Sequence, residues 1–301
     1  MPEPPGNLSP APGAASGLAR LGVVVHPSRK IDAPLNALRR WAQEHDADLV
    51  QIAIPGHDRR IADVGDVAGC DLIISIGGDG TMLAALRAAL TAGRPTLGVA
   101  CGSLGVLTAI EADGLAQALD RFSRREWIPR RLPALAIAAE GGEDLLALND
   151  LVILRAGIGQ VRVTTSVDGV LYTRLAGDGC IVSTALGSTA YALAAGSALL
   201  TPETEAYLLT PLSTHGGFRQ PLVISAETEL RLEINQGVGG AKLEIDGQAV
   251  DVEPPDTLSV RLRADVATMV TFADQEPLLA ALRRRRLIVD SPRIVAERER
   301  D

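Results

Sequence analysis

The feature that most constrains the fold is an apolar run that ends in a glycine-rich turn and continues as a helix. Residues 71–76 form a short apolar run, which is typical of a buried strand. The sequence Gly-Gly-Asp-Gly-Thr at 77–81 follows directly, and helical spacing over 82–90 begins immediately after it. A strand that turns sharply into a helix is the repeating unit of a parallel sheet with right-handed crossovers.

The residues before and after this unit repeat the same alternation. Apolar runs at 21–25, 49–54 and 95–99 predict three further strands, and helical spacing over 34–44 predicts a helix between the first two. We therefore expect an α/β domain with a parallel sheet over residues 19–132. The first 18 residues are rich in Pro, Ala and Gly, and we interpret them as a disordered extension and not as a signal peptide.

The pattern changes near Pro133. Short apolar segments now follow one another with turn-forming residues between them, and one helix is expected, after Ser188. The segments predicted as strands are 134–139, 145–154, 161–167, 180–184, 222–225, 228–234, 241–245 and 257–263. We expect a β-rich domain over 133–268. The segment 269–301 regains helical spacing at 276–287, and we expect this C-terminal helix to pack back on the first domain.

Composition narrows the classes of function. The 301 residues exceed the usual size of one hydrophobic core, which agrees with two domains. The formal net charge of −8 argues against a general nucleic-acid binder. No apolar run reaches about 18 residues, so we expect no membrane span. Cys70, Cys101 and Cys180 are odd in number and widely spaced, which favours reduced thiols in the cytoplasm over disulfides or a zinc site.

The glycine-rich turn has the chemistry of a phosphate site. Glycines let the backbone take positive φ angles and approach a ligand closely, and a helix start offers free N–H groups and partial positive charge. Thr81 is placed to cap the helix. Asp79 is unusual beside phosphate, and either a metal ion or proton abstraction would account for it. A tight turn with an Asx-type hydrogen bond is the structural alternative.

Two further motifs carry polar groups at strand ends. Asn149-Asp150 follows an apolar run, and this pair can grip two adjacent ribose hydroxyls, although a strand-end turn explains it as well. Asp178 precedes a strand that enters the hydroxyl-rich turn at 183–191, where Ser188 or Thr189 would cap the next helix. Small hydroxyl residues near a helix start suit an anion or a sugar, and a capped helix with a buried Tyr191 ring is the alternative.

In order along the chain, these motifs resemble the NAD kinase family from about Leu21 to Leu287. The Gly-Gly-Asp-Gly motif is shared with diacylglycerol kinases, sphingosine kinases and phosphofructokinases, whereas Gly-Ser-Thr-Ala-Tyr at 187–191 is more specific. The other matching pieces are Leu104-Gly105, Leu148-Asn149-Asp150, Asp178-Gly179, Thr210-Pro211 with His215, Pro221-Leu222-Val223 and Asp246-Gly247-Gln248. The resemblance implies an α/β domain like those of NAD and diacylglycerol kinases, followed by a β-rich domain.

The resemblance also implies a role for each matching residue. Asp79 would be the general base that activates the 2′-hydroxyl of the adenosine ribose. His215 and Asp246 are equally well explained as a backbone-bonded histidine and a hairpin turn. ATP would bring Mg²⁺ with it, so no residue is expected to be a direct metal ligand. The residues expected to bind the substrates are Gly77, Gly78, Gly80, Thr81, Asn149, Asp150, Asp178, Ser188, Thr189, Ala190, Tyr191, His215 and Asp246.

The expected function is therefore that of a kinase, a transferase that converts NAD to NADP with ATP and Mg²⁺, in a cytoplasmic homodimer or homotetramer. Several positions depart from the family pattern, namely Ala100, Val106, Ala185, Ala194 and Gln220. In the family these positions lie around the substrates, whereas Asp79 is retained. The sequence therefore supports phosphoryl transfer and leaves the identity of the acceptor open. A kinase of the same fold acting on a sugar, polyol or nucleoside is the first alternative. A non-catalytic dinucleotide-binding sensor is the second, and polyphosphate as donor or NADH as acceptor stays open.

Overall fold

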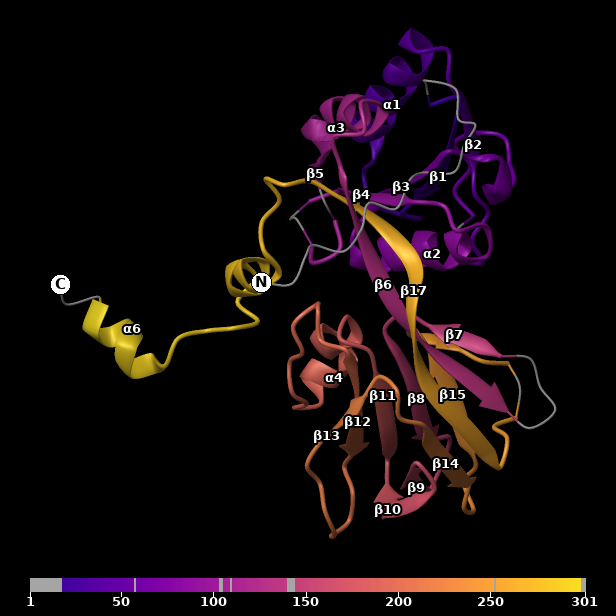
Figure 1. The fold of residues 1–301 in the computed structure, drawn as a ribbon, viewed down its shortest axis with the longest axis vertical. Coiled ribbons are helices and arrows are strands. Elements are labelled where there is room, and N and C mark those ends of the chain that lie inside the picture. The colour runs from indigo at the N-terminus through magenta and orange to yellow at the C-terminus, as the bar shows by residue number, and fades with distance from the viewer. Residues whose placement is uncertain are drawn as a thin grey trace, which may run out of the picture. The chain divides into compact units, whose positions relative to one another are not determined.

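A computed structural model describes residues 18–56, 58–102, 105–108, 110–139, 144–251 and 253–298 (Figure 1). Its contacts divide the chain into two compact units. The first comprises the chain up to Ala85, Thr96–Ile128 and Val270–Gln275; the second comprises Leu86–Pro95, Pro129–Met269 and the chain from Glu276 onward. Residues 1–17, predicted as part of an extension, lie outside the described residues. In the described part, no helix is long and apolar enough to cross a membrane.

The first unit is built on a parallel sheet in the order β4-β3-β1-β2, with β5 beside β4. The strands are β1 (Arg20–Val25), β2 (Asp48–Gln51), β3 (Leu72–Gly77), β4 (Thr96–Ala100) and β5 (Ile110–Glu111). The helices are α1 (Asp32–Glu44), α2 (Asp79–Ala89) and α3 (Leu115–Ser123). The central strands are largely apolar and almost wholly buried because helices cover both faces of such a sheet.

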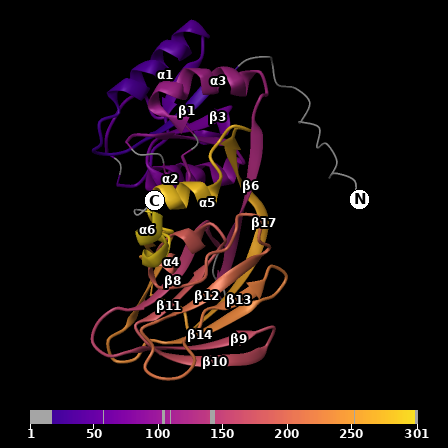
Figure 2. The same cartoon turned by 90° about the vertical axis from the view of Figure 1, so that its left-hand side faces the viewer.

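The helices of this unit are distributed in a way that matters for ligand binding. Helices α1 and α3 cover one face of the sheet, and the start of α2 lies on the other (Figures 1 and 2). Helix α1 follows β1, and α2 follows β3, which is the neighbouring strand. The chain therefore leaves the carboxyl ends of two adjacent strands in opposite directions. Such a switch point is where open α/β sheets bind their ligands.

The second unit is a β-sandwich. One sheet has the order β13-β12-β11-β8-β15-β16, and the facing strands run β10-β9-β14-β17, with β6 paired to β17 and β7. Apolar side chains from both sheets form one buried cluster between them. The strands are β6 (Ile128–Ala139), β7 (Leu145–Ala147), β8 (Asp150–Arg155), β9 (Val161–Val167), β10 (Val170–Gly177), β11 (Gly179–Ser183), β12 (Ala206–Leu212), β13 (Leu222–Ser225), β14 (Leu230–Asn235), β15 (Ala241–Ile245), β16 (Gln248–Ala249) and β17 (Thr257–Thr271).

The short helices differ from the expected pattern. The helix expected after Ser188 is reduced to a 3-10 turn, Gly187–Thr189, and the four residues of α4 (Tyr191–Ala194). At the end of the chain lie α5 (Leu278–Arg284) and α6 (Pro292–Arg298). Of the predicted C-terminal segment 269–301, Val270–Gln275 group with the first unit and Glu276 onward with the second.

The predicted strand 145–154 is interrupted, so β7 and β8 are separate. The backbone N–H groups of Leu148, Asn149 and Asp150 turn away from strand pairing and donate to the carboxylate of Asp246. A side chain almost 100 residues away thus breaks a segment whose apolar pattern predicts one continuous strand.

Candidate active site

The glycine-rich turn joins β3 to α2 at the switch point of the first unit. None of Gly77, Gly78 and Gly80 has a positive φ angle, so the expectation that they are needed for such angles is wrong. The reason is steric. A Cβ at Gly77 would overlap the side chain of Thr81, and one at Gly78 would lie 3.3 Å from Nη1 of Arg29. Gly80 faces open space.

Helix α2 begins at Asp79, so Thr81 lies inside its first turn and does not cap it. Thr81 is buried against the turn, whereas Asp79 is partly exposed. A helix start leaves N–H groups without intrahelical partners. An anion placed at this turn would therefore meet backbone donors and no side chain at Gly80.

The carboxylate of Asp79 is fixed by a loop that follows β4. It accepts hydrogen bonds from the backbone N–H of Val106 at 3.0 Å and of Leu107 at 2.9 Å. Gly105 packs against the same carboxylate so closely that a Cβ there would overlap Oδ1. The N–H of Gly105 donates to Oγ1 of Thr108 at 2.6 Å, which closes the loop. The matched Leu104 lies outside the described residues.

The second unit gathers Asn149, Asp150 and Asp246 at one end of β8. The carboxylate of Asp246 accepts from the N–H groups of Leu148, Asn149 and Asp150 at 3.2, 2.7 and 3.3 Å, and Nε of Arg87 lies 3.7 Å away. The side chain of Asp246 is fully buried. Sequence reasoning offered a hairpin turn as its alternative role, and the structure shows that it also organises a distant turn.

Burial and the nearby carboxylates of Asp246 and Glu244 raise the pKa of Asp150 from 3.8 to about 7. Burial also raises the pKa of Asp246, but its three backbone donors and Arg87 act against that rise. Asp150 therefore holds a proton more readily than an ordinary aspartate does.

Hydrogen bonds connect the segment around Asn149 and Asp150 to Thr184, at the start of the hydroxyl-rich turn. Thr184 donates from Oγ1 to the carbonyl of Leu148 at 2.6 Å, and its N–H donates to the carbonyl of Asn149 at 2.9 Å. A Cβ at Gly187 would overlap that carbonyl of Asn149, so this position needs glycine. Oδ1 of Asn149 is buried and accepts no hydrogen bond from the residues that the structure describes. That orphaned acceptor fits a site that a ligand hydroxyl completes.

The hydroxyl groups of Ser188 and Thr189 form hydrogen bonds within the fold. Ser188 is fully buried; its hydroxyl donates to the carbonyl of Ala185 at 2.6 Å and accepts from the N–H of Leu200 at 3.0 Å. Thr189 donates to the carbonyl of Leu186 at 2.9 Å. The residue at the cap of α4 is Ala190, with no side-chain hydrogen bond, so the prediction of a Ser188 or Thr189 cap is wrong. Tyr191 is 43% exposed, which contradicts the alternative of a buried ring.

Asp178 and His215 form a separate group at the other end of β8. Asp178 receives a hydrogen bond of 2.5 Å from Nε of Arg155, and this bond holds the pKa of the Asp178 carboxyl below its ordinary value. Ser213 and His215 contribute in the same direction. Because β11 pairs Gly179 with Leu154 and Ser183 with Asp150, this group lies one strand length, roughly 13 Å, from Asp150. The sequence showed no sign of Arg155.

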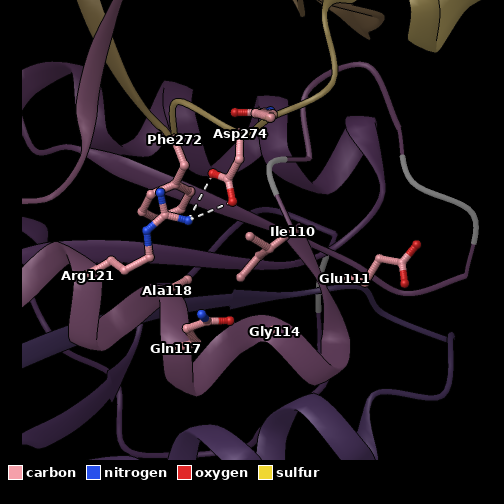
Figure 3. Close-up of a pocket in the computed structure, with 9 residues that line it drawn as sticks. Ile110, Glu111, Gly114, Gln117, Ala118, Arg121, Phe272 and Asp274 are labelled. Atoms are coloured by element: carbon pink, nitrogen blue, oxygen red, sulfur yellow. Dashed lines mark hydrogen bonds and ion pairs between the residues drawn. The ribbon is translucent and has the colours of Figure 1, made fainter.

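The first unit also contains a pocket of about 170 Å³, which is lined by α3, β5 and residues of the segment that follows β17 (Figure 3). Arg121 lies over the ring of Phe272, 4.3 Å from its centroid, and pairs with Asp274 at 2.9 Å. None of the predicted site residues lines this pocket. Among the residues that the structure describes, no three His, Cys, Asp or Glu side chains gather as a metal site.

Comparisons with known proteins identify this two-domain chain as a phosphotransferase with an alcohol acceptor. Models of the ATP-NAD kinase N-terminal and C-terminal domains match residues 22–127 and 148–271. The chain belongs to the NAD kinase family. It is 33% identical to NAD kinase 2 of Streptomyces coelicolor over 224 residues, 72% of this chain and 74% of the relative.

Two solved structures share the fold. An Archaeoglobus fulgidus NAD kinase in complex with ATP is 26% identical, with a TM-score of 0.71 over 90% of this chain and 100% of the other. A yeast NADH kinase complexed with NADH is 20% identical, with a TM-score of 0.74 over 91% of this chain and 89% of the other. The second likeness concerns the fold alone.

Proposed function

We propose that the chain transfers the γ-phosphoryl group of ATP to the 2′-hydroxyl of the adenosine ribose of NAD and so produces NADP. The observation that carries this proposal is the carboxylate of Asp79, which two backbone N–H groups hold at the glycine-rich turn of a chain in the NAD kinase family. A site that only bound dinucleotides would gain nothing from a carboxylate beside phosphates.

The donor side fits a nucleoside triphosphate. The turn at Gly78 and Gly80 leaves the first N–H groups of α2 accessible, and the partial positive charge of the helix start favours phosphate. The ATP complex of the Archaeoglobus relative supports the choice of ATP. Mg²⁺ bound to the nucleotide would neutralise phosphate charge during transfer.

Asp79 would act as the general base. The proton of the 2′-hydroxyl moves to a carboxylate oxygen of Asp79, the hydroxyl oxygen bonds to the γ-phosphorus, and the bond from phosphorus to the β-phosphate oxygen breaks, which releases ADP. Asp79 accepts hydrogen bonds from the N–H groups of Val106 and Leu107, and because the residue is partly exposed, a substrate hydroxyl can approach it. The two bonds also fix the direction of the carboxylate before substrate arrives.

The acceptor side rests on Asn149 and Asp150. The orphaned Oδ1 of Asn149 would accept from a ribose hydroxyl, and Asp150 would offer a proton or an acceptor according to its ionisation. We include Asp178, Thr189, Ala190, Tyr191 and His215 in the acceptor site on the family resemblance. Because Ser188 is occupied by Ala185 and Leu200, its part would be to hold the turn.

The test is an acceptor panel with purified protein, ATP and Mg²⁺, containing NAD, NADH, nucleosides and simple sugars. NADP formation is followed with an NADP-specific dehydrogenase, and turnover of other acceptors is followed by ADP release. Asp79→Asn should lower kcat by ~10²–10⁴-fold, whereas Asp48→Asn, on an exposed position of the same unit, should not. ADP release with a sugar and none with NAD would refute the acceptor. NAD binding without any turnover would favour a sensor.

We also propose a cytoplasmic homodimer or homotetramer. The predicted acceptor residues form two groups one strand length apart, at opposite ends of the pair β8 and β11. In an oligomer, the Asp178 group of one copy would lie beside the Asn149–Asp150 group of another. Light scattering of the purified chain tests this, and a monomer at the concentrations that give full activity would refute it.

A further inference from the structure

The carboxyl end of β1 carries a cation that none of the motifs includes. β1 ends at Val25, and His26 then folds the chain back on itself. Nδ1 of His26 accepts from the N–H of Ser28 at 3.2 Å and from the N–H of Arg29 at 3.1 Å. The N–H of His26 donates to the carbonyl of Ile76 at 2.9 Å, so this loop is fixed to the end of β3. Arg29 is thereby brought to the glycine-rich turn.

The guanidinium of Arg29 lies directly against that turn. Its Nη1 is 3.3 Å from where a Cβ of Gly78 would stand, and the same nitrogen donates to the carbonyl of Cys101 at 3.1 Å. It therefore bridges the carboxyl ends of β3 and β4 from the loop after β1. A guanidinium has five N–H donors, so one bond to Cys101 leaves donors for a ligand. Arg29 is exposed, and nothing in the described part of the chain forms an ion pair with it.

A second arginine supports the first. Nη1 of Arg59 donates to the carbonyl of Arg29 at 2.6 Å. The backbone of Arg59 is held in turn by Gln51, whose buried side chain accepts from the N–H of Ile61 and donates to the carbonyl of Arg59, both at 2.7 Å. The positive charges of both arginines oppose the effect of burial, which raises the pKa of the Cys101 thiol. In a chain with a net charge of −8, two cations thus converge on the phosphate-binding turn.

We propose that Arg29 binds the terminal phosphates of the nucleotide donor at Gly78, and that Arg59 is a positioning residue for it. The proposal deepens the proposed function, since it names the side chain that complements the backbone donors of the turn. Arginine suits phosphate because its planar fork can form two parallel hydrogen bonds to one phosphate group. A base or sugar in the same place would leave the cation without a counter-charge.

The test compares the affinity of the purified full chain for ATP and for AMP by calorimetry. We expect Arg29→Met to weaken ATP binding by about 10- to 100-fold, the effect of one charge-assisted hydrogen bond, and to leave AMP binding unchanged. Arg29→Lys should recover part of the loss, because it keeps the charge and loses the fork. Arg40→Met removes an exposed charge on α1 and is the matched control.

A measurement on the unmodified protein covers the case in which Arg29→Met does not fold. A dicarbonyl reagent that modifies arginine is applied with and without nucleotide, and modification at Arg29 is read by mass spectrometry. ATP should protect Arg29, and AMP should not. The proposal is refuted by equal modification with ATP and AMP, by ATP affinity of Arg29→Met within about twofold of the wild type, or by a wild type that binds ATP no better than AMP.

These outcomes are separable from those of the acceptor panel. A chain that fails to phosphorylate NAD but binds ATP through Arg29 would keep this inference and lose the proposed acceptor. A chain that makes NADP but binds ATP equally well without Arg29 would keep the function and lose the inference.

Discussion

Asp246 offers the sharpest test of how the second unit is built. Its buried carboxylate is the acceptor for three consecutive backbone N–H groups, those of Leu148, Asn149 and Asp150. Asp246→Ala removes that acceptor and leaves three N–H donors without it, two of them on the buried residues Leu148 and Asp150. The perturbation acts on the turn between β7 and β8, almost 100 residues away in sequence, and not primarily on the hairpin that contains Asp246.

The magnitude follows from the hydrogen bonds. A bond to a charged group contributes about 1.5–3 kcal/mol, and the three bonds share one carboxylate, so their contributions do not add fully. Removing the like charge beside Asp150 also lowers the cost of ionising Asp150, which offsets part of the loss. We expect a net destabilisation of about 3–5 kcal/mol, which is a large part of the stability of an ordinary domain.

The assay has to report on the second unit by itself. Trp41 and Trp127 both belong to the first unit, so tryptophan fluorescence would miss the effect. Hydrogen exchange with mass spectrometry on peptides covering 145–155 and 241–250 reads the affected strands directly. A loss of 3 kcal/mol corresponds to exchange roughly 100-fold faster. Asp251→Ala, on an exposed position after the same hairpin, is the control.

One result would contradict the reasoning. If the amides of 145–155 exchange within about twofold of the wild-type rate in Asp246→Ala, the carboxylate does not hold the turn. Faster exchange confined to 241–250 would mean that Asp246 serves only its own hairpin.

Three more predictions follow from the same contacts. Because Asp150 has a pKa of about 7 in the folded chain and an ordinary value of 3.8, the folded chain keeps a proton that the unfolded chain releases, and stability falls as the pH rises from about 4 to 7. Asp150→Asn should therefore raise Tm relative to the wild type at about pH 8 and not at about pH 4, and equal differences at both would contradict the assignment. Gly105→Ala should push the Asp79 carboxylate aside and lower kcat at least tenfold, with little change in Tm. A kcat equal to that of the wild type would show that the close contact between Gly105 and Asp79 is not needed. Thr184→Val should cost about 1–3 kcal/mol in urea unfolding, because it removes the bonds to Leu148 and Gly187, and no loss would mean that water replaces them.

Sequence reasoning located the glycine-rich turn correctly but misjudged why glycine is needed. A strand followed by Gly-Gly-Asp-Gly and a helix is a local pattern, and the structure has β3, the turn and α2 in that order. The steric demand at Gly77 comes from the neighbouring Thr81, whereas the nearest atom at Gly78 is the end of the flexible Arg29 side chain, on another loop. Local sequence predicts where a turn lies, whereas the packing that selects its residues depends on segments brought together by the fold.

Contacts between distant segments also explain why parts of the second unit differ from the prediction. Asn149-Asp150 offers a strand-end turn within the segment 145–154, but the sequence does not indicate that the acceptor holding this turn is Asp246. The helix expected after Ser188 shrank to one short turn because the Ser188 hydroxyl binds Ala185 and Leu200 and not the helix start. Helix α3 was not predicted, although Leu115, Ala118 and Leu119 have helical spacing and are buried.

Asp79 and Asp246 both stand next to a glycine in the sequence. The structure distinguishes them by how accessible each carboxylate is. Asp79 and Asp246 both accept N–H groups from segments far along the chain, 27 and 28 residues away for the first and 96 to 98 for the second. The side chain of Asp246 is fully buried, and it contacts three backbone donors and Arg87, so the contacts that the structure shows for it are structural. Asp79 is partly exposed, with two backbone donors and a helix start beside it. A carboxylate that is fixed and still accessible can receive a proton from a substrate, and accessibility therefore distinguishes the candidate base from the structural acid.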